Sequence, residues 1–371
     1  MSPSPYTGAP GTPKDALDTP ALCLDLDAFD RNVARMAGTF KKTGVGWRPH
    51  TKGIKVPAIA HRLIAAGAFG VTCAKVSEAE VMAQAGIRDI LVANEVIGEI
   101  KTRRLAYLCR QADVVVGVDS PVGIAQLDKA AGEVGTRPRV LVEVNTGMNR
   151  CGVQPGDPAA ALARRVADSP NLRFAGVMGW EGHATTVADP DEKRAAVKQA
   201  VGQLTASADA CRAAGLDVQI VSCSGTGTYA YAAELPGVTE VQAGGGVLGD
   251  VHYRDDYHVD HETALTVLTT IISRPTDRTI ITDGGFKTLG TLYGAHEPIG
   301  VAKDSIETLR YSAEHGIVRL KEPANTPKVG DRLEYIVGYS DSTVFLHDTL
   351  HGIRHGKVEA AWDIAGRGKL Q

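Results

Sequence analysis

The 371-residue chain is poor in aromatic residues, has no long hydrophobic run and carries almost no net charge. No apolar stretch approaches the roughly 18 residues that a membrane-spanning helix needs, so we expect no membrane partner. The 40 basic and 43 acidic residues leave a formal charge of -3, and this balance does not favour a nucleic-acid partner. The N-terminal residues also lack the apolar core of a signal peptide.

The six cysteines form no CxxC pair and show no zinc-type spacing. In a chain of this length they are typical of buried, reduced thiols, so we expect a cytoplasmic location. Nucleotide-binding motifs of the GxxxxGK[ST] type, or of the GxGxxG type between a strand and a helix, are also missing. Glycine is abundant instead, with 41 residues, which suits tight turns and close approach of the backbone to a ligand.

Between residues 40 and 250, eight short apolar runs alternate with helical patterns. Such runs, rich in β-branched residues, are typical of parallel strands that are buried on both faces. Eight strand-helix units favour a closed (β/α)₈ barrel, over residues 26–260, rather than an open doubly wound sheet. One helix is predicted over residues 77–85, with Ser77 as its N-cap and Gly86 as its stop. The runs are 45–47, 69–73, 89–93, 113–118, 140–144, 174–178, 218–222 and 239–242.

The texture changes after residue 260, where strand patterns follow one another without helices. We predict a second, mainly antiparallel β-domain built from residues 19–25 and 261–371, and a mobile tail over residues 1–18. The strands are expected at 263–272, 279–282, 316–320, 332–337, 343–346 and 352–362, the last with a turn at 354–356. Three histidines near its end, His347, His351 and His355, are expected on an exposed hairpin.

In a parallel barrel the chemistry lies at the C-terminal ends of the strands. The first run is followed by Arg48-Pro49-His50-Thr51-Lys52. A lysine in the mouth of a barrel is partly desolvated, which lowers its pKa and makes it a nucleophile toward carbonyl carbons. The alternative is an ordinary surface lysine, and the position at the strand end favours Lys52 over Lys55 as the reactive group.

Charged side chains also follow the fifth and sixth runs. Arg150 follows the fifth, where its guanidinium can pair with an anion, or lie in solvent as an ordinary loop residue. Trp180, Glu181 and His183 follow the sixth, so an aromatic ring, a carboxylate and an imidazole share one strand end. This grouping indicates a functional site, with a purely structural histidine as the alternative.

Two glycine-rich loops follow the seventh and eighth runs, at residues 224–228 and 244–246. Loops after strands seven and eight form the usual phosphate site of such barrels, because their backbone N–H groups converge on one anion. Glycine there lets the backbone approach the phosphate or adopt a positive φ. The sequence therefore predicts a phosphate-containing ligand.

These motifs, taken in order, resemble those of the D-threonine aldolase and D-serine dehydratase family, within the alanine racemase-like class of pyridoxal phosphate enzymes. The resemblance covers most of the chain and rests on residues 48–52, 73–80, 147–153, 181–183 and 224–228. It implies an alanine racemase-like fold, pyridoxal 5′-phosphate as cofactor, a small amino acid as substrate and a homodimer. It further implies that Lys52 carries the cofactor, that Arg150 faces its phenolic oxygen and that His183 is a catalytic acid or base. The phosphate cup would comprise Gly225, Thr226, Gly227, Gly244 and Gly245.

The chain departs from the family pattern at four positions. The resemblance implies a divalent metal held through a histidine and an aspartate or cysteine two positions later, with Mn²⁺ or Mg²⁺ as the candidate ions for this chain. Here the two positions are Tyr339 and Asp341, which leaves Asp341 as the one candidate metal ligand and predicts weak or absent metal binding. Ile54 replaces a second histidine, while Gly246 and Trp180 replace two tyrosines.

The resemblance implies a lyase that cleaves D-configured β-hydroxy-α-amino acids by a retro-aldol reaction, releasing glycine and an aldehyde. The alternatives on the same scaffold are a β-eliminating dehydratase of the D-serine or 3-hydroxyaspartate type and an amino-acid racemase or epimerase. The altered metal position favours these alternatives, since a metal would serve to activate the β-hydroxyl group. A non-catalytic cofactor-binding protein is disfavoured because Glu181 and His183 are present.

Overall fold

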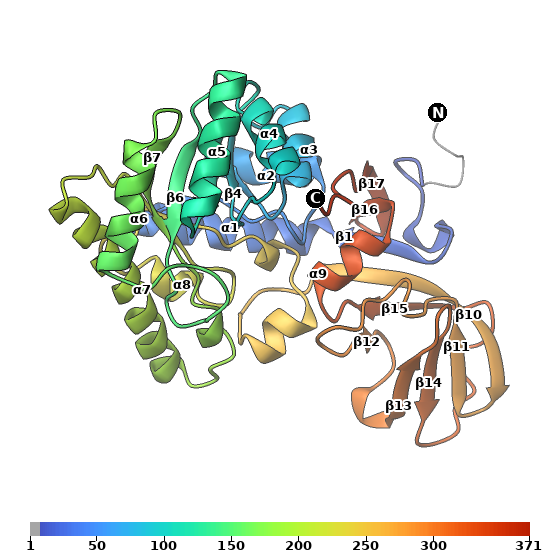
Figure 1. The fold of residues 1–371 in the computed structure, drawn as a ribbon. Helices are drawn as coiled ribbons and strands as arrows, with labels where there is room; N and C mark the ends of the chain where they lie inside the picture. Colours follow the sequence, from blue (N-terminus) through green and yellow to red (C-terminus); the bar gives the residue numbers. More distant parts are fainter. Residues whose placement is uncertain (1–7) are drawn as a thin grey trace. The chain divides into compact units, whose positions relative to one another are not determined.

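The computed structural model describes residues 8–371, which divide into two compact units (Figure 1). We call one the barrel unit; it comprises Ala34–Lys52, Pro57–Gly245 and Gly368–Gln371. The other, the β unit, comprises Gly53–Val56, Gly246–Arg367 and the described part of Met1–Val33. The boundary between the units falls within helix α1 (Leu26–Thr43) and directly after Gly245. No helix in the described chain combines the length and apolarity needed to cross a membrane.

Eight parallel strands form the barrel, as the sequence predicts. They are hydrogen-bonded in the order β2-β9-β8-β7-β6-β5-β4-β3, and a parallel bridge between His50 and Thr72 joins the two ends of this series. One apolar side chain from each of several strands fills the interior, including Leu91, Val115 and Leu141. The strands are β2 (Gly46–Trp47), β3 (Val71–Cys73), β4 (Asp89–Val92), β5 (Asp113–Val118), β6 (Arg139–Glu143), β7 (Arg173–Met178), β8 (Ile220–Cys223) and β9 (Glu240–Val241).

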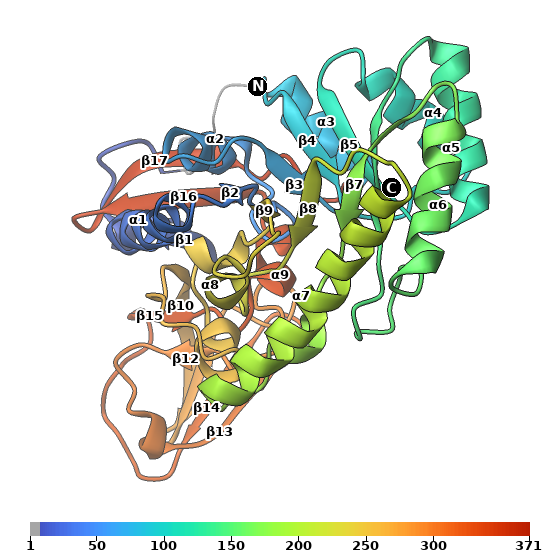
Figure 2. The same cartoon turned by 90° about the vertical axis from the view of Figure 1, so that its left-hand side faces the viewer.

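Helices follow the strands, and α4, α5 and α6 lie side by side along one flank (Figures 1 and 2). Polar N-caps begin two of the helices: the Ser120 and Asp189 side chains accept backbone N–H groups, each just before a proline in the first turn. The helices of the barrel unit are α2 (Pro57–Ala65), α3 (Val76–Gln84), α4 (Glu99–Leu108), α5 (Pro121–Val134), α6 (Asp157–Asp168), α7 (Pro190–Ala213) and α8 (Tyr229–Ala232).

The predicted N-cap of α3 is wrong. Ser77 lies inside the helix, and its hydroxyl donates to the carbonyl oxygen of Gln371 at 2.7 Å, so the end of the chain takes the hydrogen bond that a cap would use. The predicted stop is confirmed, because Gly86 follows the last turn with a φ of +91°.

The β unit contains a nine-stranded sheet that is mainly antiparallel. As predicted, the N-terminal strand joins it: β1 pairs antiparallel with β10 and parallel with β16. The strands are β1 (Ala21–Asp25), β10 (Leu265–Thr276), β11 (Thr279–Thr282), β12 (Glu297–Pro298), β13 (Ile306–Tyr311), β14 (Gly316–Leu320), β15 (Arg332–Ile336), β16 (Thr349–Arg354) and β17 (Lys357–Asp363).

The segment predicted as a strand over residues 343–346 is helical. It contains the end of α9 (Ser340–Thr343) and a 3₁₀ turn over Val344–Leu346. Its β-branched residues favour a strand locally, but Thr343 and Val344 are buried, and Thr343 Oγ1 accepts the Gly290 N–H at 3.2 Å. Tertiary contacts therefore override the local preference.

Two further expectations about the β unit need correction. Of the predicted mobile tail, residues 1–7 lie outside the described residues, whereas the following segment is bound: Gly11 donates to the Val358 carbonyl at 2.8 Å, and Leu17 is buried. His347 and His351 do not lie on an exposed hairpin, because their rings bond the carbonyl oxygens of Thr288 and Leu22. Only His355, in the turn between β16 and β17, is exposed as predicted.

Candidate functional site

Lys52 lies at the C-terminal end of β2, at the predicted position, and is half-buried. Its backbone N–H donates to Nδ1 of His50 at 3.3 Å, which shapes the turn after the strand. The Nζ atom lies 5.9 Å from the centre of the Trp180 ring. The lysine therefore projects toward the loop that follows β7.

Trp180 connects the predicted cofactor residues to one another. The guanidinium carbon of Arg150 lies 4.9 Å from the centre of its ring, within range of a cation–π interaction. A Cβ atom at Gly225 would lie 3.2 Å from Trp180 Nε1, so the indole also packs against the first glycine-rich loop. Lys52, Arg150 and Gly225 thus meet around one aromatic side chain, which the sequence had placed in a functional grouping with Glu181 and His183 but not beside the cofactor residues.

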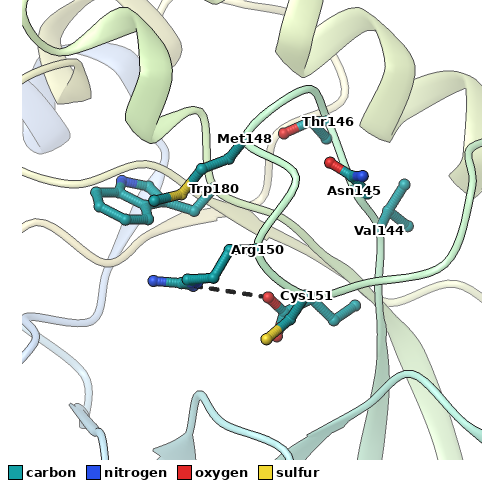
Figure 3. Close-up of a pocket in the computed structure, with 8 residues that line it drawn as sticks. Val144, Asn145, Thr146, Met148, Arg150, Cys151 and Trp180 are labelled. Carbon is teal, nitrogen blue, oxygen red and sulfur yellow. Dashed lines mark ion pairs between the residues drawn. The ribbon is translucent and has the colours of Figure 1, made fainter.

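Arg150 is anchored from the opposite side by a residue that the sequence analysis missed. Its Nη2 atom lies 3.7 Å from Oε1 of Glu143, the last residue of β6. In Figure 3 the guanidinium lies beneath the Trp180 ring, and the dashed line joins it to that carboxylate. The arginine side chain is 51% exposed, whereas that of Glu143 is 5% exposed. The acidic partner of this ion pair is therefore buried, whereas the basic partner is half-exposed.

Glu143 belongs to a small cluster at the strand ends. Its carboxylate, that of Glu95 and the Cys151 sulfur have ligand atoms within 4.8 Å of one another. Burial, and then the neighbouring Glu95, raise the pKa of Glu143 to about 8, against the lowering effect of Arg150. Burial and the same two carboxyl groups raise the pKa of the Cys151 thiol to about 11. A signal existed in the sequence, since a glutamate inside the apolar run 140–144 needs a reason to be buried.

The two glycine-rich loops start side by side, because β8 and β9 are neighbours and Gln242 N–H donates to the Cys223 carbonyl at 3.0 Å. A Cβ atom at Gly244 would overlap the His50 carbonyl, so only glycine fits there. The expected positive φ is not found at Gly225 or Gly227; it occurs at Ser224, with a φ of +67°. These glycines allow close approach rather than a left-handed backbone. Thr226, Gly227 and Gly245 are buried in the same two loops.

Glu181 and His183 have different surroundings although they are two residues apart. Glu181 is 1% exposed and accepts the Thr228 hydroxyl at 2.5 Å, which ties the loop after β7 to the first glycine-rich loop. His183 is exposed on a short 3₁₀ turn (Gly182–Ala184), and its ring lies against Gly147 in the loop that carries Arg150. Glu181 therefore holds two loops of the site together, while the His183 imidazole is exposed at the site.

The residues around Asp341, in the β unit, do not fit a divalent metal. The Tyr339 hydroxyl donates to Asp341 Oδ2 at 3.0 Å, and burial followed by the Asp341 charge raises the pKa of this phenol well above its usual range. A phenol that keeps its proton is a hydrogen-bond donor and a poor ligand. His252 lies nearby, with ring centres 4.8 Å apart, but its Nδ1 atom is engaged by Asp256 at 2.5 Å. Among residues 8–371, the one compact group of three metal-binding side chains is Glu95, Glu143 and Cys151.

Fold and site together define a class: a barrel that places a lysine, an arginine and two glycine-rich loops at its strand ends, followed by a mainly antiparallel sheet, is the alanine racemase-like architecture. Residues 24–252 match the model of the alanine racemase N-terminal domain, and residues 264–353 match that of a serine dehydratase domain. The chain belongs to this family, for which pyridoxal 5′-phosphate is the typical cofactor.

Similar proteins span the full chain. It is 34% identical to 3-hydroxy-D-aspartate aldolase of Paracoccus denitrificans (strain Pd 1222), covering 97% of this chain and 95% of the relative. It is 35% identical to D-threonine aldolase of an Arthrobacter species, over 98% and 96% of the two chains. The crystal structure of D-threonine aldolase from Filomicrobium marinum superposes with a TM-score of 0.94 at 37% identity, covering 98% of this chain and 100% of that one.

Proposed function

We propose that this protein is a pyridoxal phosphate-dependent lyase that cleaves D-configured β-hydroxy-α-amino acids into glycine and an aldehyde. The observation that carries the proposal is the convergence of Lys52, Arg150 and the Gly225 loop on Trp180 at the strand ends of the barrel. Two full-length relatives named as aldolases support the reaction class.

The barrel unit offers groups that fit each part of the cofactor. Lys52 has an amine in the mouth to bind its aldehyde carbon, and the Arg150 guanidinium is placed to neutralise an oxygen on its ring. A Cβ atom at Gly244 would overlap the His50 carbonyl, and one at Gly225 would crowd the Trp180 indole, so the backbone of both loops lies bare there, which suits a phosphate held by N–H groups. The proposed phosphate cup is Gly225, Thr226, Gly227, Gly244 and Gly245.

Cleavage of the bond between Cα and Cβ requires loss of the β-hydroxyl proton and return of a proton to Cα. When bound, the cofactor supplies the electron sink for the electron pair left on Cα. His183 is exposed beside the Arg150 loop, where its imidazole can accept the hydroxyl proton and release it afterwards. Lys52, beside the Trp180 ring, is the amine available to protonate Cα. No step is assigned to a metal, because the Tyr339–Asp341 pair does not fit one.

One observation favours a second candidate, namely racemisation at Cα, which needs no assistance to the β-hydroxyl group. The phenol of Tyr339 occupies the position at which the family places a metal-binding histidine, so assistance to the β-hydroxyl is reduced. Racemisation begins with removal of the α-proton, for which Lys52 is a suitable base.

Product analysis separates these reactions. The holoenzyme is incubated with D-threonine, D-serine and D-3-hydroxyaspartate, and glycine, aldehyde, 2-oxo acid, ammonia and the opposite enantiomer are quantified. We expect glycine and an equimolar amount of aldehyde. Formation of 2-oxo acid with ammonia would establish the dehydratase, and the opposite enantiomer alone would establish the racemase.

We further propose that the protein is a cytoplasmic homodimer. All six cysteines are free thiols, which suits a reducing compartment, and the dimer is inferred from the family. Light scattering on the purified protein is expected to give twice the chain mass of 39.1 kDa. A monomer at micromolar concentration would contradict this state.

A further inference from the structure

We propose that Glu143 is a positioning residue, whose buried carboxyl group directs the Arg150 guanidinium across Trp180. The inference deepens the proposed function, on which the role of Arg150 toward the cofactor rests.

The geometry makes Arg150 depend on Glu143. The arginine leaves β6 on the loop that follows Glu143, and half of its side chain is exposed. Two contacts hold its head group: the carboxylate at 3.7 Å and the Trp180 ring centre at 4.9 Å. An exposed arginine without an anchor samples many rotamers, and ordering so long a side chain costs conformational entropy. The buried carboxylate at the strand end provides a fixed anchor on a rigid element.

Several ionisable groups surround Glu143. Glu95 follows β4, Asp119 follows β5, and Cys151 and Arg150 lie on the loop after β6 itself; the β7 residue packed against Gly117 beside it is the uncharged Met178. Of these groups, only the Arg150 guanidinium favours the ionised form of Glu143, so the carboxylate and the guanidinium stabilise each other.

The same cluster is a poor metal site despite its ligand types. A cation within 4.8 Å of the two carboxyl groups and the thiol would lie beside the positive charge of Arg150. The thiol would also have to lose a proton that its surroundings hold firmly, since its pKa is raised to about 11.

The first test uses the cofactor-free protein and measures alkylation of Cys151 by iodoacetamide, with peptide mapping to separate it from the other cysteines. Glu95→Gln is expected to accelerate alkylation severalfold, because Glu95 is the neighbouring acid that does most to raise the pKa of the Cys151 thiol. Arg150→Gln is expected to slow it. The control Glu133→Gln disrupts an exposed pair with Arg103 and is expected to change nothing.

The double variant Glu143→Gln/Arg150→Gln decides the positioning role. If Glu143 holds Arg150 in place, the loss of Arg150 has little further effect on alkylation in the Glu143→Gln background. Additive effects of the two substitutions would show that Arg150 keeps its place without Glu143, and would overturn the proposal. Protection of Cys151 by equimolar Zn²⁺, lost in Glu143→Gln, would identify a metal site instead and would also overturn it.

The same cycle is then measured with pyridoxal 5′-phosphate, by equilibrium dialysis of the wild-type protein and the three variants. We expect each single variant, and the double variant, to raise Kd by about tenfold, since both residues act through one guanidinium. Independent effects, near a hundredfold in the double variant, would contradict the proposal. If the wild-type protein itself fails to bind the cofactor, the proposed function fails, while the alkylation cycle still decides the role of Glu143.

Discussion

The charged side chains at the two ends of the barrel are arranged in opposite ways. Strand β6 shows both arrangements, because it begins with Arg139 and ends with Glu143. Its first residue, Arg139, lies 2.9 Å from both Asp89 and Asp113, the first residues of β4 and β5. Arg48, which is 1% exposed, reaches Asp89 at 2.5 Å and Glu240, the first residue of β9, at 3.0 Å. Each of these arginines is thus held between two acids at short distance.

At the other end of β6 the balance is reversed. Glu143 and Glu95 lie together, and their nearest cation is the half-exposed Arg150, at 3.7 Å from Glu143. The N-terminal network therefore serves stability, whereas the C-terminal cluster keeps charges incompletely matched. Unmatched charge with a shifted pKa is typical of functional sites, and in barrels such sites lie at the C-terminal end.

The largest effect is expected at the C-terminal end, from Lys52→Ala. Loss of the amine that binds the cofactor should reduce turnover by at least about 10³-fold while leaving the free energy of unfolding nearly unchanged. Borohydride treatment of the wild-type holoenzyme should fix the cofactor on a peptide containing Lys52, as mass spectrometry will show. Labelling that persists in Lys52→Ala and disappears in Lys55→Ala would move the assignment to Lys55.

Arg48→Ala should disrupt the ion-pair network at the N-terminal ends of the barrel strands and lower the free energy of unfolding. It leaves the Glu240 carboxylate, which is 5% exposed, without its cation, and such a loss costs about 3–5 kcal/mol. Urea unfolding measures the change. Arg103→Ala, which removes only an exposed pair with Glu133, is the matched control and should cost less than about 1 kcal/mol. Equal effects of the two substitutions would refute the distinction between a buried and an exposed network.

Glu143→Gln should have the opposite consequence and stabilise the protein at high pH. The folded-state pKa of about 8 lies above the ordinary value of 4.5, so the contribution of Glu143 to stability is fully present below about pH 4.5 and is lost as the pH rises through about 8. The loss amounts to at most about 1.4 kcal/mol per pH unit, and the glutamine variant should not show it.

Unfolding free energies of both proteins, measured between about pH 5 and pH 8, give this difference directly. Asp250, whose pKa burial raises to about 7, contributes a slope of the same sign to both proteins and cancels in the comparison. Parallel pH curves would mean that Glu143 is ionised throughout this range in the folded state.

Gly225→Val tests the phosphate loop with a smaller effect. The added side chain would crowd Trp180 Nε1, which lies 3.2 Å from the position of the new Cβ, and should weaken cofactor binding about tenfold. Gly202→Val is the control, because nothing lies within 4 Å of its Cβ position. Equal cofactor affinity in the two variants would exclude Gly225 from the binding loop.

Chelation should have the smallest effect. Because Tyr339 is a protonated donor to Asp341, exhaustive treatment with EDTA should leave the rate essentially unchanged, and Mn²⁺ or Mg²⁺ should not increase it. Progress curves before and after treatment provide the measurement. Complete loss of activity with recovery on metal addition would show that the Tyr339–Asp341 pair is part of a metal site after all.

The local sequence pattern was sufficient to predict most strands and helices, but it was insufficient to predict the tertiary contacts of their side chains. Short β-branched runs with glycine and proline punctuation predict eight strands, since strands buried on both faces have no other means of hiding so much apolar surface. The preference of β-branched residues for strands gave a wrong prediction at Thr343 and Val344, because these side chains are buried equally well in a helical segment. The prediction of Ser77 as an N-cap failed for a related reason, because its hydrogen-bond partner, Gln371, is 294 residues away in the chain.

For the candidate site, strand order placed Lys52, Arg150, His183 and the glycine-rich loops at one end of the barrel, because all parallel strands present their C-terminal ends together. The position of Trp180 beside Lys52, Arg150 and Gly225, and the burial of Glu143 beside Glu95, depend on how residues far apart in the chain pack. A pKa is set by burial and by neighbouring charges, and both are properties of the folded chain. The sequence therefore specifies which reactive groups are present at the mouth, while packing specifies which of them keep a proton and which are held in place.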